Sequence, residues 1–155
     1  SSKNIIEKNN IKNYLRAGIA LESDWQRPLV RPAVYSRPNF GPSPTMKWAY
    51  GNTEKNVIKN NVIGEPYRPG GCAIYMAQIG TMDSLNNNII SENIVTQSAN
   101  LKHYLYVFEE SAGKLNGNVL TGNTFTGAST SQFYMSREKG HFSVQKNNVI
   151  LKDIK

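Results

Sequence analysis

A short phrase that recurs five times constrains the fold of this chain more than any other feature. The phrase is an aliphatic residue, two variable residues, an asparagine, one variable residue and another apolar residue. Its asparagines are Asn9, Asn60, Asn93, Asn123 and Asn147, which lie 51, 33, 30 and 24 residues apart. Internal repeats with periods in this range are typical of solenoids and other repeat architectures. We therefore interpret the chain first as a series of repeated units.

A second apolar segment follows four of the five phrases. These segments are residues 19–21, 73–76, 104–108 and 133–135. They are short, rich in β-branched and aromatic residues, and bounded by Asn and Gly, which predicts strands. A helix would need ten or more residues with a period of 3.6, and no stretch has them. The unit is thus strand, asparagine turn, strand and variable loop, repeated four and a half times.

The simplest structure with this pattern is a right-handed parallel β-helix of about five coils. Equivalent strands would then stack about 4.8 Å apart. The asparagine amide can bond to the next coil, and asparagine tolerates the left-handed conformation of a tight corner. A buried polar group without a partner would cost about 1–3 kcal/mol, so we expect a continuous asparagine ladder. The alternative is an antiparallel sandwich, which favours Asn-Gly hairpin turns, and only Asn116-Gly117 offers one.

This repeat pattern resembles that of the pectin-lyase-like right-handed parallel β-helix superfamily. The short Asn-rich coils and one long aromatic loop are similar to a section of a bacteriophage tailspike or appendage protein. The resemblance implies a chain that binds, and in some members degrades, bacterial surface polysaccharide, assembles as a homotrimer, and is located in a virion tail or outside the cell. The alternatives are a secreted bacterial polysaccharide lyase or glycoside hydrolase, and a non-catalytic structural or adhesin β-helix.

One segment, residues 22–55, is too long for a turn between coils. It holds five of the seven prolines and both tryptophans. Proline is disfavoured in a sheet interior, and a long loop on a rigid scaffold is often functional. We predict that Trp25, Arg27, Tyr35 and Trp48 form the wall of a glycan groove. The alternative is that they pack the loop onto its own coil or onto a neighbouring subunit.

Two pairs of carboxylates follow the second strands of their coils: Glu22 with Asp24, and Glu109 with Glu110. Two coil steps would place the pairs about 10 Å apart. That approaches the separation of roughly 6.5–9.5 Å found in inverting glycosidases, so these four residues are the catalytic candidates. The alternative is that they are solvated charges at strand ends. If the chain is an enzyme, a glycoside hydrolase is favoured over a lyase.

A lyase would need a base and a cation to neutralise a uronate carboxylate. Arg137, Arg68, Lys102 and His103 are the candidates for those roles. Four aromatics, Tyr104, Tyr106, Phe133 and Tyr134, alternate along the later strands, so some must face outward. Outward aromatic rows form glycan platforms or subunit contacts. Tyr106 and Arg137 are therefore predicted to contact substrate.

Composition narrows the remaining classes. The 155 residues carry a net charge of +7 without long basic runs, which fits an anionic glycan better than nucleic acid. One cysteine and two histidines argue against a disulfide framework and a metal site, and no cofactor is expected. No apolar run is long enough for a membrane span. We expect one β-helix domain over residues 1–155. Because neither terminus shows a capping helix, we expect that it is cut from a longer β-helix or that partner chains cover its ends.

Overall fold

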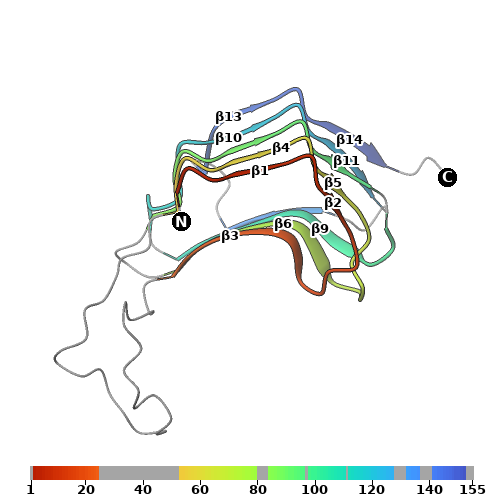
Figure 1. Ribbon diagram of the computed structural model, residues 1–155. Coiled ribbons are helices and arrows are strands. Elements are labelled where there is room, and N and C mark those ends of the chain that lie inside the picture. Colours follow the sequence, from red (N-terminus) through yellow and green to blue (C-terminus); the bar gives the residue numbers. More distant parts are fainter. Residues whose placement is uncertain are drawn as a thin grey trace, which may run out of the picture.

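The computed structural model of the chain describes residues 2–24, 53–79, 84–96, 98–110, 112–127, 132–136 and 141–152. Within these residues every regular element is a β-strand. The strands form five successive repeats (Figure 1). Repeats 1 to 4 each contain three strands, and repeat 5 contains two. This order follows from the sequence, because short apolar runs alternate with Asn and Gly turns throughout.

The first strand of each repeat is short and ends at a tight turn. These strands are β1 (Ile5–Glu7), β4 (Val57–Lys59), β7 (Ile89–Ser91), β10 (Asn118–Thr121) and β13 (Phe142–Lys146). The second strands are β2 (Asn10–Ile11), β5 (Val62–Ile63), β8 (Ile94–Val95), β11 (Thr124–Gly127) and β14 (Val149–Lys152). The third and longest strands are β3 (Ala17–Asp24), β6 (Gly71–Ile79), β9 (Leu101–Glu109) and β12 (Gln132–Met135).

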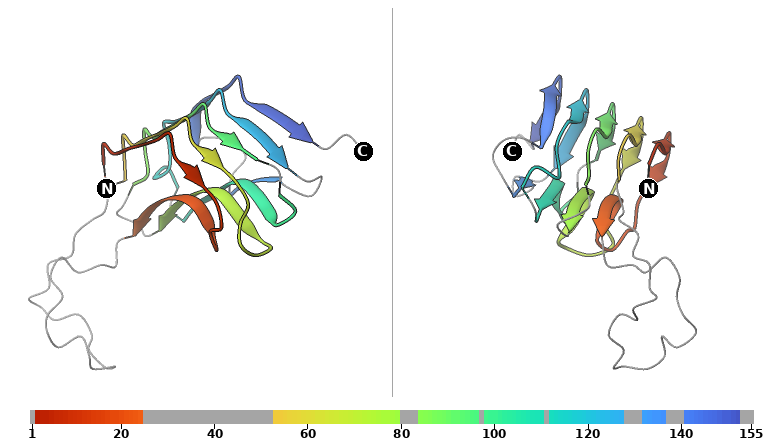
Figure 2. Two further views of the ribbon diagram at one scale, coloured as in Figure 1. Left: turned by 45° about the vertical axis from the view of Figure 1, so that its right-hand side comes forward. Right: turned by 90° about the vertical axis from the view of Figure 1, so that its left-hand side faces the viewer.

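Equivalent strands pair side by side, so the described residues form three parallel sheets. Their orders are β1-β4-β7-β10-β13, β14-β11-β8-β5-β2 and β12-β9-β6-β3. The chain visits the three sheets in the same order in repeats 1 to 4, and repeat 5 adds β13 and β14 to the first two sheets. The repeats lie one beside the next from the N-terminal to the C-terminal end (Figure 2). The prediction of an all-β chain of parallel strands with an asparagine ladder is confirmed.

The core consists of rows of equivalent apolar residues, one per repeat. Ile58 pairs with Ile90, Ile63 with Val95, and Met76 with Val107, and all six side chains are fully buried. Because side chains alternate along a strand, each row has its counterpart directly above and below. The row that contains Ile58 ends in repeat 5 with Gln145, which is exposed.

A ladder of asparagine side chains follows the turn between the first and second sheets. Its members, the second ladder below, are Asn9, Asn61, Asn93, Asn123 and Asn148. Asn93 is typical: its Oδ1 accepts bonds of 3.0 Å from both the backbone N and the Nδ2 of Asn61. Its Nδ2 donates to Ile58 O at 3.0 Å and to Asn123 Oδ1 at 2.9 Å. Each buried amide is thereby satisfied by its neighbours, as the sequence pattern led us to expect.

The ladder corrects the predicted register in two repeats. The sequence phrase selected Asn60 and Asn147, whereas the ladder contains the residues that follow them, Asn61 and Asn148. Asn60 and Asn147 are exposed and have left-handed φ values of 55° and 56°. The two properties expected of one asparagine, amide bonding and tolerance of the left-handed turn, are thus divided between neighbours in these repeats.

A further ladder, which we call the first ladder, lies five residues before the second in repeats 1 to 4. It contains Asn4, Asn56, Asn88 and Asn118, joined by amide bonds of 2.9 Å. Left-handed residues again precede its members, for example Lys55 and Asn87. The sequence prediction of one asparagine per repeat missed this ladder. It ends at Asn118, where the pairing of β10 with β13 shifts register.

Candidate functional site

A row of outward-facing tyrosines runs across the third sheet. Tyr75 on β6, Tyr106 on β9 and Tyr134 on β12 occupy equivalent positions, and we call them the tyrosine row. Tyr106 and Tyr134 stack with ring centroids 4.3 Å apart and planes 14° apart. Tyr75 and Tyr106 are 5.4 Å and 21° apart. Nearly parallel rings at these distances are offset stacks, so each ring covers part of its neighbour's face.

Strand alternation explains why these tyrosines point outward. Their neighbours along β6 and β9, Ile74, Met76, Leu105 and Val107, are fully buried in the core. Tyr134 in contrast is 38% exposed. The outer surface of this sheet therefore presents aromatic rings that the core does not use.

Tyr104 and Phe133 take the opposite orientation. Both pack inward beside the buried Phe125, with ring centroids 4.9–5.7 Å apart. Of the four predicted platform aromatics, Tyr106 and Tyr134 face outward, and Tyr104 and Phe133 belong to the core.

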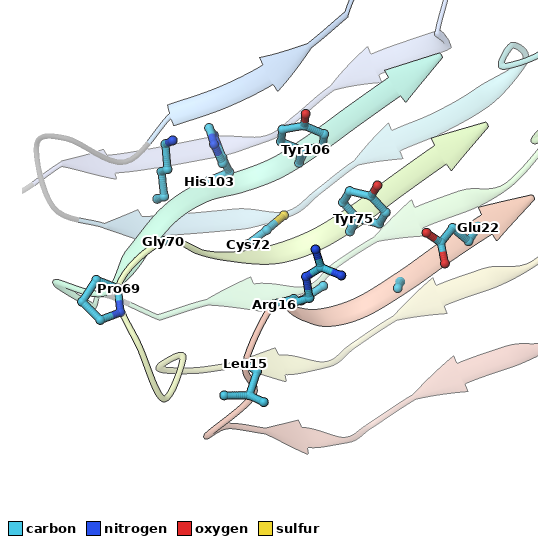
Figure 3. A pocket seen from close by; sticks show the side chains of 12 residues that line it. Leu15, Arg16, Glu22, Pro69, Gly70, Cys72, Tyr75, His103 and Tyr106 are labelled. Carbon is cyan, nitrogen blue, oxygen red and sulfur yellow. The ribbon is translucent and has the colours of Figure 1, made fainter. Parts of the chain in front are cut away.

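A hollow of about 460 Å³ lies beside the tyrosine row (Figure 3). It forms because the position equivalent to Tyr75 in repeat 1 is Ala20, so the row ends there without a ring. The face of Tyr75 on that side borders the hollow instead of another tyrosine. Sites for small ligands are hollows of this size, from about 300 to 1,000 Å³.

Charged and polar groups surround the hollow. Arg16 reaches it from the turn before β3, and Glu22 reaches it from β3. Lys102 and His103 reach it from β9. Burial raises the pKa of the Tyr75 hydroxyl, the Glu22 carboxylate raises it further, and Arg16 lowers it. Both charged side chains therefore act on the edge of the Tyr75 ring. The His103 ring meets Tyr106 edge-on, with centroids 5.3 Å apart.

Cys72 lies at the base of the hollow and is nearly buried. Burial raises the pKa of its thiol to about 12. The Sγ lies 2.8 Å from Ile74 O, to which it donates. The thiol is therefore neutral near pH 7, and since the thiolate is the reactive form, the site favours contact over nucleophilic chemistry.

Of the four predicted catalytic residues, Glu22 and Glu109 lie on opposite sides of the third sheet. Glu22 is exposed and is in register with Ala77, whereas Glu109 is in register with Gln78 and is buried. Neighbouring positions on a strand face opposite sides of a sheet. Glu110 is exposed at the end of β9, and Asp24 ends β3, with its side chain outside the described residues.

Glu109 bonds to the fold itself. Its Oε1 accepts from the backbone N of Lys114 at 2.8 Å and of Leu115 at 2.9 Å. Its Oε2 lies 3.4 Å from His141 Nε2, and both side chains are only 2% exposed. These contacts connect repeat 3 to the turn before β10 and to the start of repeat 5. The role of Glu109 that these contacts support is therefore to stabilise the fold.

Several predicted substrate contacts lie outside the described residues: Trp25, Arg27, Tyr35, Trp48 and Arg137. Those predictions stay predictions. The sequence reasoning missed Arg16, Ala20, Cys72 and Tyr75 as residues of one site. A usable signal existed, since aligning the long strands places tyrosine at the same point in three repeats and alanine in the first.

Across the described ranges, no group of three His, Cys, Asp or Glu side chains is placed to hold a metal ion. The described residues also contain no helix long and apolar enough to cross a membrane. No protein family matches the sequence, and neither curated proteins nor solved structures show significant similarity to it.

Proposed function

We propose that this chain is a section of a right-handed parallel β-helix that binds an extended polysaccharide on the outer face of its third sheet. The β-helix is supported by the regular visit of each repeat to the same three parallel sheets and by the two ladders. A polysaccharide fits because it is itself a repeating chain and can follow a surface that repeats at the strand spacing, about 4.8 Å.

The observation that carries the proposal is the tyrosine row beside a hollow with charged rims. Tyrosine combines an apolar ring with a hydroxyl, which suits sugars, since these also combine apolar faces with hydroxyl groups. The core does not need these rings. The net charge of +7 is compatible with anionic as well as neutral glycans.

The setting is part of the same proposal. A glycan-binding β-helix of this kind fits a trimeric tailspike-like protein of a virion, or another protein outside the cell. Measuring the molar mass in solution tests the proposed trimer. A mass of three chains is expected, and the mass of one chain would contradict the trimer and leave glycan binding to a single chain.

The test is a screen of the chain against capsular and O-antigen polysaccharides, followed by titration of the best ligand. We expect Tyr106→Ala to weaken binding about tenfold, equivalent to about 1.4 kcal/mol. The matched control is Tyr67→Ala, because Tyr67 is 63% exposed and lies outside the hollow. Equal effects of the two substitutions, or no binding to any glycan, would contradict the proposal.

The same incubations test cleavage. New reducing ends that disappear in Glu22→Gln would add a hydrolase activity, and new absorbance from an unsaturated uronate would indicate a lyase. Binding without either product would leave the chain as a binding section, and Glu109 is not a candidate for catalysis because it is buried and bonded to the fold.

A further inference from the structure

We propose that the hollow at Ala20 is a subsite for one neutral pyranose ring, which stacks on the face of Tyr75 that no other tyrosine covers. This inference rests on the proposed glycan binding and assigns the position and chemistry of one sugar within it. In the tyrosine row, Tyr106 is stacked on both faces, by Tyr75 and by Tyr134. Tyr134 is stacked on one face, by Tyr106. Tyr75 and Tyr106 both line the hollow, and Tyr75 is the one whose strand neighbour on the other side is Ala20 instead of a tyrosine.

The base of the hollow suits the apolar face of a sugar. Ala17, Ala20 and Cys72 are small side chains that line it. Ala20 is the position at which a fourth tyrosine would continue the row. A pyranose bound there would occupy the place of that missing ring.

The rim of the hollow suits hydroxyl groups. Glu22 can only accept hydrogen bonds at neutral pH, and Arg16 can only donate them. A sugar hydroxyl both donates and accepts, so neighbouring hydroxyls on one ring can bond to both side chains. Arg16 and Lys102 also lie on the rim, but Glu22 acts on the Tyr75 hydroxyl more strongly than Arg16 does. A ring carboxylate stacked at Tyr75 would therefore meet the negative charge of Glu22, and we assign the subsite to a neutral sugar.

The experiment is a titration of the full chain with the methyl glycosides of glucose, galactose and mannose. Binding is measured from the changes in amide chemical shifts in NMR spectra. We expect one of these probes to bind and to change the amide chemical shifts of the residues around Tyr75. Ala20→Tyr should fill the hollow and weaken binding of that probe at least tenfold. Ile94→Tyr adds the same ring at an exposed position of β8, outside the hollow, and is the matched control, with affinity unchanged.

A second variant keeps the test decisive if Ala20→Tyr does not fold. Tyr75→Ala removes the stacking face and should also weaken binding of the probe at least tenfold, whereas Tyr67→Ala, at an exposed tyrosine outside the hollow, should not affect it. Unchanged affinity in Ala20→Tyr or Tyr75→Ala would overturn the subsite. So would tighter binding of a methyl uronide than of every neutral glycoside, or binding of no probe at all.

The outcome also separates this inference from the broader proposal. If the polysaccharide binds and depends on Tyr106 but not on Ala20 or Tyr75, only the subsite fails. If the affinity for the polysaccharide does not depend on Tyr106, the proposed function fails as well.

Discussion

The asparagine ladders and the tyrosine row are both stacks of one residue type, yet they lie in opposite surroundings. The middle members of the ladders are buried, and their hydrogen bonds run from each repeat to the next. The tyrosine row faces outward, and it is interrupted at Ala20. The comparison teaches that a buried row of repeated residues is what the fold requires, whereas a repeated row on the outer face is not needed by the core, and we propose that it serves binding.

The largest expected effect is in the second ladder. Asn93→Ala removes four hydrogen bonds, leaves the buried backbone N of Asn61 without its side-chain acceptor and takes one donor each from Ile58 O and Asn123 Oδ1. Since each such group costs about 1–3 kcal/mol, we expect a loss of at least about 3 kcal/mol in the free energy of unfolding, measured with urea. The control is Asn60→Gly, at an exposed left-handed position where glycine is tolerated, with a change below about 1 kcal/mol. A larger loss for Asn60→Gly would contradict the corrected register.

The next effect separates two neighbouring carboxylates. Glu109→Ala leaves the backbone N of Lys114 and Leu115 without an acceptor and His141 without its carboxylate contact. A buried donor left without an acceptor costs about 1–3 kcal/mol, so we expect a loss of about 2–3 kcal/mol in the free energy of unfolding. Glu110→Ala, one residue further on and exposed, should change the free energy by less than about 0.5 kcal/mol. Similar losses for the two variants would show that Glu109 is not the structural member of the pair.

A smaller effect concerns the thiol at the base of the hollow. The pKa of Cys72 rises from 9.0 to about 12 on burial, so between these values the folded state holds a proton that the unfolded state loses. Stability from this group is complete below about pH 9 and is lost as the pH rises toward 12. Cys72→Ala should flatten this decline, measured as urea midpoints from pH 8 to 11. The wild-type and variant curves would run parallel if the thiol did not contribute.

The sequence predicted the repeating strands because their apolar residues and asparagines recur where the core and the turns need them. It left the register ambiguous where two asparagines are adjacent. Val57 and Val62 fit the phrase around Asn60 as well as Ile58 and Ile63 fit it around Asn61. Only the burial of Ile58 and Ile63 decides between them.

The candidate site was predicted in part. Tyr106 and Glu22 came from the sequence, because both stand out at strand positions. The hollow did not, because it depends on Ala20, a residue whose meaning appears only when four strands are aligned side by side. A missing ring has no local sequence signature.

The most direct test compares stability and glycan affinity in one double variant, Tyr106→Ala with Tyr134→Ala. We predict that the affinity for the best polysaccharide ligand falls at least tenfold by calorimetric titration, while the core remains folded because both rings lie on the outer face. A double variant that binds the polysaccharide as tightly as the wild type would contradict the assignment of function to the tyrosine row.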